Sequence, residues 1–254
     1  MAELHIDLLG GLRVRTAAGR DIRIASRKSQ ALLGCLALKP GSVFTRDFLA
    51  ALLWEDSDPE LARASLRQAL ANLRRSLPVA CAVALRGDGG TVSLDPALVS
   101  SDVERFQALI RDGSPGALAT AVERHAGELL EGLDARSAAF EQWLLERRQD
   151  QRRVLLQAAQ RMAAQCATAG DNAGAIVALE RLVGIEPSNE RAQRDLMEAL
   201  ARQGRYTDAL RQYRSCCEAL RRDLDVGPEP ATESVYRELL RRRRAAAPPP
   251  RDAA

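Results

Sequence analysis

The feature that most constrains this chain is an amphipathic helix predicted over Pro59–Leu77. Asp58 is suited to cap this helix, Pro59 suits its first position, and Pro78 ends it. At about 100° per residue, one side of the helix carries a narrow apolar stripe, formed by Leu66, Leu70, Leu73 and Leu77. Such a stripe must pack against other elements, so we expect a folded domain that leaves most of this helix exposed.

The remaining surface of the helix is positively charged. The segment from Leu61 to Gly87 contains no Asp or Glu and five arginines, which are Arg63, Arg67, Arg74, Arg75 and Arg86. The face opposite the stripe consists of Ala64, Ser65, Arg67, Gln68, Ala71, Asn72 and Arg75. Alanines allow a groove wall to approach closely, and Gln, Asn and Arg can form paired hydrogen bonds to base edges. The pattern indicates a DNA-recognition helix, with a solvated arginine face as the alternative.

The preceding residues predict the scaffold of a helix-turn-helix. Three short β-prone runs predict a small antiparallel sheet over Leu4–Leu9, Leu12–Arg15 and Asp21–Ile24. A helix follows from Ser26 to Pro40, and a second runs from Thr45 to about Trp54. Their predicted core residues are Leu32, Leu33, Leu36, Phe48, Leu49, Leu52 and Leu53.

The residues after the recognition helix predict a hairpin. Cys81, Val83 and Leu85 alternate with small residues, a Gly-rich turn follows, and Thr91–Leu94 forms the second alternating run. A hairpin beside a recognition helix is a wing, and we expect Arg86 at its tip. From there Arg86 could contact phosphates or a minor groove, although a lone arginine in a turn is also exposed without such a role.

Further cations are candidates for contacts to phosphate. Arg27 and Lys28 lie in the first turn of their helix, where the helix dipole disfavours positive charge, so we expect an external anion there. Two solvated side chains are the alternative. Arg46, Arg63 and Arg74 complete the predicted set of phosphate contacts.

The second part of the chain is predicted to be all-α. Ser101–Glu104 has the form of a capping box, so 96–100 is the expected linker. The segments Gly170–Ile176 and Gly204–Leu210 are 34 residues apart, the period of tetratricopeptide helix pairs. Stacked pairs offer a concave surface for a protein, a second copy included, or for a small signal. We therefore expect a DNA-binding domain over 1–100, a helical domain over 101–244 and a disordered tail over 245–254.

Charge and composition exclude several other classes. Residues 1–100 hold 13 Lys and Arg against 10 Asp and Glu, whereas residues 101–254 hold 24 of each, so the excess charge belongs to the first domain. The Arg241–Arg244 run could contact phosphate, but a helix C-terminus favours cations in any case. No stretch approaches 18 apolar residues, so we expect a cytoplasmic protein without a membrane span.

The residues of catalytic and metal sites do not occur in suitable patterns. The two histidines, His5 and His125, have no partners at metal-site or triad spacing, and no phosphate-binding P-loop motif occurs. The five cysteines fall on apolar patterns and lack Cys-x-x-Cys spacing, so we expect core thiols, with redox sensing by Cys216 and Cys217 as the weaker alternative. We therefore expect no enzyme, no cofactor and no metal.

The order of these parts resembles a known family. The segments that carry the resemblance are Ser26–Leu33, Leu49–Trp54 and Ala62–Arg75, together with the turn 186–190 and the ending Val226–Thr232. They resemble the OmpR-type winged helix and helical domain of the bacterial SARP-like activators. The resemblance implies major-groove roles for Arg67, Gln68, Asn72 and Arg75, with Ser65 beside them, and a wing role for Arg86.

The implied function is transcriptional regulation. We expect a sequence-specific regulator of double-stranded DNA, an activator in preference to a repressor, acting as a homodimer on repeated half-sites. Glu55 and Asp56 in the acidic turn are candidates for a contact with RNA polymerase. The neighbouring Asp58 and Glu60 need no such contact, because helix capping explains them. A scaffold whose winged helix does not read DNA is one alternative. A hydrolase acting on nucleic acid is another, but it would need an acid/base or metal cluster.

Overall fold

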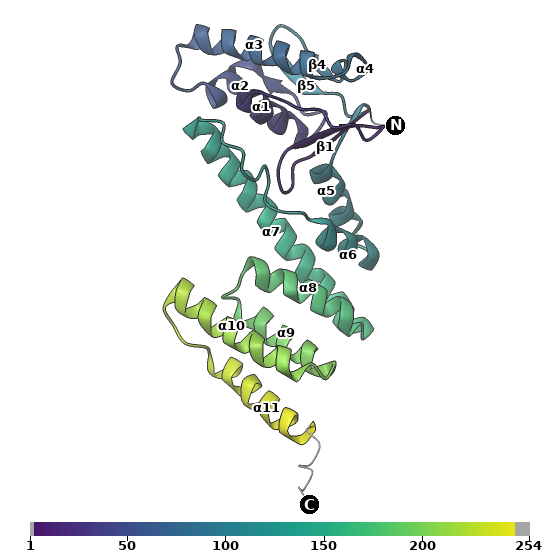
Figure 1. Ribbon diagram of the computed structural model, residues 1–254, viewed down its shortest axis with the longest axis vertical. Helices are drawn as coiled ribbons and strands as arrows, with labels where there is room; N and C mark the ends of the chain where they lie inside the picture. Colours follow the sequence, from purple (N-terminus) through teal and green to yellow (C-terminus); the bar gives the residue numbers. More distant parts are fainter. Residues whose placement is uncertain (1–2, 247–254) are drawn as a thin grey trace, which may run out of the picture. The chain divides into compact units, whose positions relative to one another are not determined.

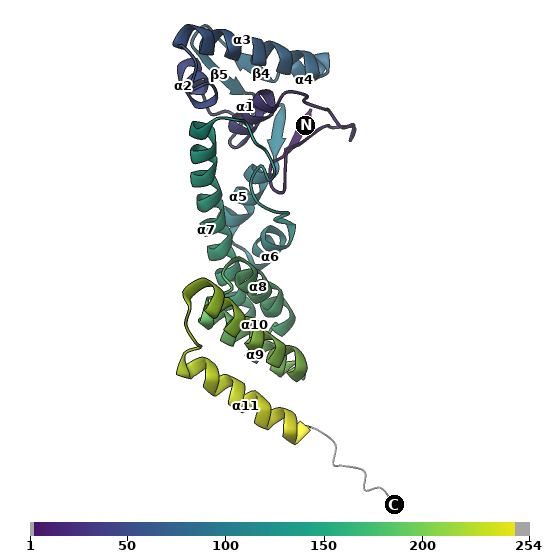
Figure 2. The ribbon, with the colours of Figure 1, turned by 60° about the vertical axis from the view of Figure 1, so that its left-hand side comes forward.

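The computed structural model describes residues 3–246, which are mainly helical, as predicted. They form two compact units, shown in Figures 1 and 2. Unit 1 contains residues 3–112 and 124–151, and unit 2 contains residues 113–123 and 152–246. The long helix α7 (Ala138–Ala169) contributes residues to both units. These bounds differ from the predicted domains 1–100 and 101–244.

Unit 1 contains a three-stranded sheet whose order is β2-β1-β6. β1 (Leu4–Asp7) pairs antiparallel with β2 (Arg13–Thr16) and parallel with β6 (Val99–Ser101). The third strand predicted over Asp21–Ile24 is wrong, because that segment makes only a bridge between Asp21 and Arg15 before Ser26 begins the next helix. The expected linker is wrong in part too, since its last residues lie in β6, a strand too short to show alternation.

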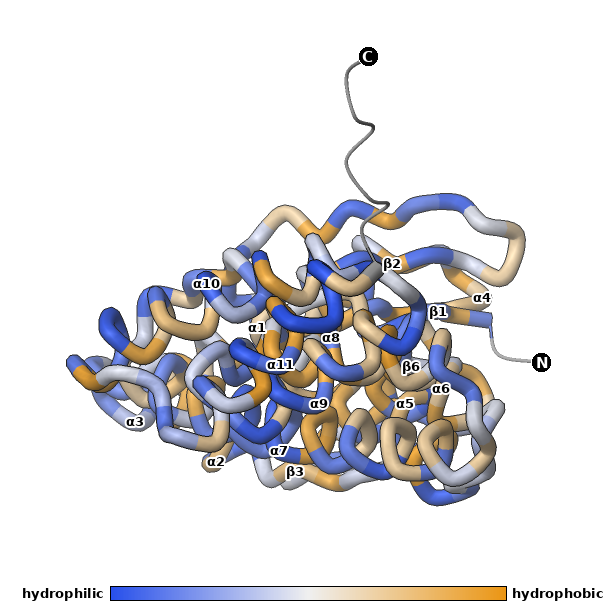
Figure 3. Tube along the Cα trace, turned by 90° about the horizontal axis from the view of Figure 1, so that it is seen from below, coloured by the Kyte–Doolittle hydropathy of each residue, from blue (hydrophilic) through white to orange (hydrophobic). Residues whose placement is uncertain are grey.

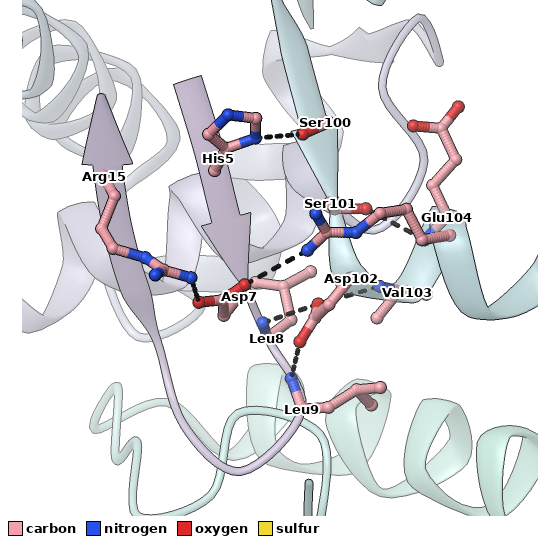
Figure 4. Close-up of polar contacts among 11 residues, drawn as sticks. His5, Asp7, Leu8, Leu9, Arg15, Ser100, Ser101, Asp102, Val103 and Glu104 are labelled. Atoms are coloured by element: carbon pink, nitrogen blue, oxygen red, sulfur yellow. Dashed lines mark hydrogen bonds and ion pairs between the residues drawn. The ribbon is translucent and has the colours of Figure 1, made fainter. Parts of the chain in front are cut away.

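Polar contacts attach β6 and the residue after it to β1 and the two residues that follow β1 (Figure 4). The Asp102 carboxylate accepts hydrogen bonds from Leu8 N at 2.8 Å and Leu9 N at 2.9 Å, and His5 Nδ1 lies 2.7 Å from Ser100 Oγ. Burial nevertheless raises the pKa of Asp102. Ser101 Oγ accepts from Glu104 N at 3.1 Å, one half of the predicted capping box, and α5 (Asp102–Asp112) begins here.

The three predicted helices of the helix-turn-helix are α1 (Arg27–Ala37), α2 (Arg46–Leu53) and α3 (Pro59–Ser76). The side chains of Ser26, Thr45 and Asp58 cap them, because each accepts a hydrogen bond from a first-turn amide. The predicted core leucines of α1 and α2 are buried. Phe48 is a correction: it is 42% exposed and stacks on Phe44 in the preceding strand, with ring centroids 6.0 Å apart.

Residues far along the chain complete the core of unit 1. Leu130, Phe140 and Leu144 are fully buried there. Leu130 N donates to Leu8 O at 2.7 Å, and a Cβ atom on Gly34 would lie 2.7 Å from Leu130 Cδ1. Glycine therefore lets α1 and Leu130 approach closely.

Unit 2 is built from helices that include α6 (Pro115–Arg124), α8 (Asn172–Ile185), α9 (Glu190–Arg202), α10 (Tyr206–Leu224) and α11 (Pro230–Ala246). α9 packs against α8 and α10, and α11 packs against both α9 and α10 (Figure 2). Hydrophilic and hydrophobic residues alternate along α10 and α11, as Figure 3 shows.

The predicted repeat is confirmed. Gly170 and Gly204 lie in turns that precede α8 and α10, with φ values of 71° and 74°, which favour glycine. Ala175 and Ala209 are buried within those helices. Of the predicted tail, residues 245 and 246 lie in α11, whereas residues 247–254 lie outside the described residues.

Candidate nucleic-acid interface

Helix α3 has the local structure that its sequence predicts. Asp58 Oδ1 accepts a hydrogen bond from Glu60 N at 2.9 Å, and Pro59 occupies the first turn. The apolar stripe is buried against the rest of unit 1, with Leu66, Leu70 and Leu73 at most 2% exposed. Burial of this stripe fixes which side of α3 faces solvent.

The opposite side of α3 carries the predicted base-reading residues. Arg67, Gln68 and Arg75 are exposed, whereas Ser65 and Asn72 are half-buried. Gln68 Nε2 donates to Asn72 Oδ1 at 3.0 Å, and Arg75 also donates to Asn72 Oδ1. Asn72 therefore orients one amide and one guanidinium group along the helix. Arg75 Nε also donates to Ala71 O at 3.4 Å, which leaves the remaining N–H groups of Gln68 and Arg75 for a partner.

Arg67 differs from its neighbours. Within residues 3–246 its guanidinium makes no hydrogen bond or ion pair, and no acidic residue follows on α3 after Glu60. An arginine without an internal anion can form a bidentate contact with a guanine edge or a phosphate without first losing a partner.

A wing follows α3, in a form that differs from the prediction. Its strands are β4 (Leu85–Gly87) and β5 (Thr91–Leu94), and β5 also pairs with β3 (Phe44–Thr45). The expected strand through Cys81 is wrong, because that residue lies in the short helix α4 (Val79–Ala82). Alternation of Cys81, Val83 and Leu85 was therefore no sign of a strand before Leu85.

Arg86 lies within β4 rather than at the wing tip. It pairs with Ser93 in the strand register, and its guanidinium forms an ion pair with Asp95, which is 5% exposed. The predicted tip position is wrong, because the hairpin turn comes two residues later. Arg86 already has a buried anionic partner, so its first role is to hold the base of the wing.

The wing tip is ordered by Asp88 and Arg46. Asp88 Oδ1 accepts hydrogen bonds from Gly90 N at 2.9 Å and Thr91 N at 2.7 Å, which lower the pKa of Asp88. Arg46 Nε donates to Asp88 O at 3.0 Å. Arg46 therefore lies at the wing tip while it starts α2, a position that suits its predicted phosphate contact.

The other phosphate candidates have internal partners. Arg63 pairs with Asp47 at 2.7 Å, and Arg74 donates to Leu85 O at 3.3 Å. Arg27 pairs with Asp134 at 3.1 Å. The premise that Arg27 requires an external anion is therefore wrong.

The expectation of an external anion is wrong for Lys28 as well. Its ammonium donates to Leu53 O and to Arg136 O and lies 5.6 Å from the centre of the Trp54 ring. Burial lowers the pKa of Lys28, against the charges of nearby carboxylates. Two carbonyls and an aromatic face replace the phosphate that the sequence suggested.

Glu55 makes hydrogen bonds within unit 1, and its contact with RNA polymerase stays a prediction. Its carboxylate accepts hydrogen bonds from Ala138 N and from Ala139 N, the latter at 2.7 Å. These amides open α7, so Glu55 caps that helix from a distant part of the sequence. Nothing local could predict this contact, because 83 residues separate the two groups. Asp56, by contrast, is exposed and makes no hydrogen bond or ion pair among the described residues.

Other chemistry is not evident in the part of the chain that the structure describes. No group of three His, Cys, Asp or Glu side chains among residues 3–246 could hold a metal ion. Cys35, Cys81, Cys166 and Cys216 are buried, and desolvation raises the pKa of Cys216 to about 12. Within the same range, no helix has the length and apolarity needed to cross a membrane.

Unit 2 contains a groove of about 540 Å³ between α7, α8 and α9. The groove is lined by Ala163, Ala164 and Ala167 of α7 and by Arg191 and Asp195 of α9, among others. A groove lined by small and charged side chains agrees with the concave surface that the repeat predicts.

Known proteins resemble this chain along nearly its whole length. The profile of the bacterial transcriptional activator domain matches residues 94–240. The regulatory protein AfsR of Streptomyces coelicolor is 28% identical over an aligned length of 249 residues, and the match covers 93% of this chain and 24% of AfsR. The regulatory protein DnrI of Streptomyces peucetius is 26% identical over 255 residues, which cover 94% of this chain and 92% of DnrI.

A third relative has a solved structure. The transcriptional regulatory protein EmbR of Mycobacterium tuberculosis is 28% identical over 270 residues, which cover 94% of this chain and 64% of EmbR. The structure of EmbR in complex with a low affinity phosphopeptide matches with a TM-score of 0.67 and 24% identity, over 95% of this chain and 66% of that one. The chain thus spans about a quarter of AfsR and about two thirds of EmbR. Since the domain profile covers more than half of its residues, the chain belongs to the SARP-like transcriptional regulators that carry a bacterial transcriptional activator domain.

Proposed function

We propose that this chain is a sequence-specific DNA-binding regulator whose α3 reads the major groove. The observation that carries the proposal is the composition of the exposed side of α3. That side presents Arg67, Gln68 and Arg75 between small alanines, and no acidic residue follows Glu60 on the helix. These are the side chains that pair with guanine and adenine edges, and the anion-free surface attracts a polyanion.

The other cations that were predicted to contact DNA differ in the partners that they have in the structure. Among the described residues, the side chains of Arg46 and Arg74 donate only to carbonyl oxygens, so they are the strongest candidates for phosphate contacts. Arg63 can contribute after it exchanges Asp47 for a phosphate. Arg27, Lys28 and Arg86 already serve the fold, so we assign them no contact with DNA.

The proposal extends to how the regulator acts. Members of the family are described as activators, which supports recruitment of RNA polymerase to a promoter in the cytoplasm. A single winged helix reads few base pairs, so we infer that two copies bind repeated half-sites. Unit 2 supplies the surface for the second copy or another protein, through its helical repeat.

Pull-down of genomic DNA fragments at moderate salt, followed by sequencing, tests this proposal. The expected result is an enriched motif with repeated half-sites, lost in the Arg67→Ala and Arg75→Ala variants. An Arg241→Ala variant provides the control, because it removes the same charge from α11. Uniform enrichment that none of the variants changes would indicate nonspecific phosphate binding and contradict the proposal.

One observation favours a second function. Val43 is 65% exposed and Phe48 is 42% exposed beside the wing, and exposed apolar side chains favour protein contacts. In this alternative the winged helix binds a protein and does not read DNA. Absence of salt-dependent DNA affinity in the pull-down would favour it.

A further inference from the structure

The turn between α2 and α3 is bound to the first turn of α7 by several polar contacts. Glu55 makes three of them, because its carboxylate oxygens accept from Ala138 N, from Ala139 N and, at 3.4 Å, from Ser137 Oγ. A carboxylate at this position also interacts favourably with the positive end of the helix dipole. All of these residues lie within unit 1.

The end of α2 is held from the same side. Ser137 Oγ, in a side chain that is 6% exposed overall, donates to Leu52 O at 2.8 Å. Lys28 donates to Leu53 O and Arg136 O, and so joins the last turn of α2 to the segment before α7. Carbonyls at a helix C-terminus lack partners within the helix, so these donors satisfy groups that would otherwise need water. We call Lys28, Glu55 and Ser137 the turn clamp.

The turn clamp has a rigid support. Phe140 and Leu144, in the first turns of α7, are fully buried in unit 1. The turn it holds spans the few residues between Leu53 and Pro59, where α3 begins. The direction in which α3 leaves this turn therefore depends on where the turn is fixed.

We propose that Glu55 is a positioning residue for DNA recognition, which fixes the turn so that α3 presents its exposed side at the correct angle. The inference rests on the proposed function, because it concerns how α3 meets DNA. A base contact requires alignment of paired hydrogen bonds, whereas a contact to phosphate tolerates small displacements. Loss of the clamp should therefore lower specific affinity and leave nonspecific affinity unchanged.

A matched pair of variants separates positioning from charge. Glu55→Ala and Asp56→Ala each remove one negative charge from the same turn, so both should raise long-range attraction to DNA equally. Asp56 makes no hydrogen bond or ion pair within residues 3–246, and only its charge acts on Lys28, so its loss leaves the hydrogen bonds of the clamp in place. We expect Asp56→Ala to bind the enriched DNA at least as tightly as the wild type, and Glu55→Ala to bind it about tenfold more weakly.

Amide hydrogen exchange gives a readout that does not depend on DNA. Exchange at Ala138 and Ala139 should become faster in Glu55→Ala but not in Asp56→Ala. If the wild type protects these amides but binds no specific DNA, the hydrogen bonds of the turn clamp are confirmed and the proposed function is contradicted. If Glu55→Ala exchanges faster yet keeps the wild-type ratio of specific to nonspecific affinity, the positioning role is overturned.

Glu55→Gln keeps the test decisive should the alanine variant fail to fold. Glutamine retains one oxygen that can accept from an amide and loses the charge. We expect a ratio of specific to nonspecific affinity between those of the wild type and Glu55→Ala. A wild-type ratio together with faster exchange would again overturn the inference.

Discussion

Two arginine-rich helices of this protein, α3 and α11, differ in how their charges are balanced. On α3, Glu60 is the last acidic residue, and Arg67 has no acidic partner among the described residues. On α11, Arg237 pairs with Glu233, and Arg241 and Arg242 both pair with Glu238. Each helix carries three more arginines than glutamates, so net charge does not distinguish them. The difference lies in the pairing of the mid-helix arginines, and it is the reason that we propose α3 as the DNA-binding helix.

The position of the cations supports the same distinction. The arginines of α11 lie in its last turns, where the helix dipole favours positive charge without any ligand. Arg67 lies in the middle of α3, beyond the reach of the dipole. An unbalanced cation in mid-helix is therefore the more specific sign of an external anion.

The largest expected effect comes from removal of the unbalanced cations. A variant with Arg67→Ala and Arg75→Ala should lose about 1 to 3 kcal/mol of DNA-binding free energy for each arginine that contacts a base. Fluorescence anisotropy with the enriched DNA measures this loss. The control carries Arg241→Ala and Arg242→Ala, which should leave affinity unchanged. Equal losses of DNA-binding free energy in the two double variants would contradict the distinction between α3 and α11.

Adding an acidic partner for the arginines of α3, such as α11 already has, should have the next largest effect on DNA affinity. Ala71 is exposed and lies four residues from both Arg67 and Arg75. Ala71→Glu should pair with these arginines and repel phosphate, lowering DNA affinity by about tenfold, while the free energy of unfolding changes by less than about 0.5 kcal/mol. Ala71→Gln, of similar size without charge, is the control. If glutamine weakens binding as much as glutamate does, steric exclusion explains the loss and charge balance does not.

The salt dependence of binding should separate Arg74 from Arg63. Arg74 donates to a carbonyl, whereas Arg63 already pairs with Asp47. Arg74→Ala should reduce the slope of log K against log salt by about one. Arg63→Ala should reduce it less, since phosphate must first displace Asp47. The opposite order would show that the internal ion pair does not limit the contact.

The smallest effect concerns acid titration of α11. The hydrogen bond from Arg242 and the charges of Arg241 and Arg242 lower the pKa of Glu238. The contribution of Glu238 to folding stability is therefore present above its ordinary pKa of 4.5, and it is lost as the pH falls through the lower pKa of the folded state. NMR titration should find this pKa below 4.5. Arg242→Ala should move it upward, toward 4.5. No change in that variant would mean that Glu238 is not balanced by Arg242.

Local patterns predicted much of unit 1. The three helix caps, the buried stripe of α3 and the exposure of Arg67, Gln68 and Arg75 follow from neighbouring residues, because caps and periodicity act within a few positions. The helical repeat of unit 2 was also predictable, since its two glycines lie at a fixed period in the sequence.

Contacts between distant segments were not predictable. The Glu55 cap on α7, the pairing of β6 with β1 and the carbonyl partners of Lys28 each join residues that are far apart in the sequence. Arg86 was misplaced by a small error in the turn, which moved it from the wing tip into β4 beside Asp95. The errors thus fall on cations and anions whose partners come from tertiary structure.

Photo-crosslinking to the enriched DNA tests the central claim most directly. A photoreactive amino acid replaces Gln68 on α3 in one protein and Arg243 on α11 in another, both exposed positions. The account predicts crosslinks from position 68 to bases within the enriched motif and none from position 243. Crosslinks from position 243 without any from position 68 would contradict it, because they would place DNA on the balanced helix.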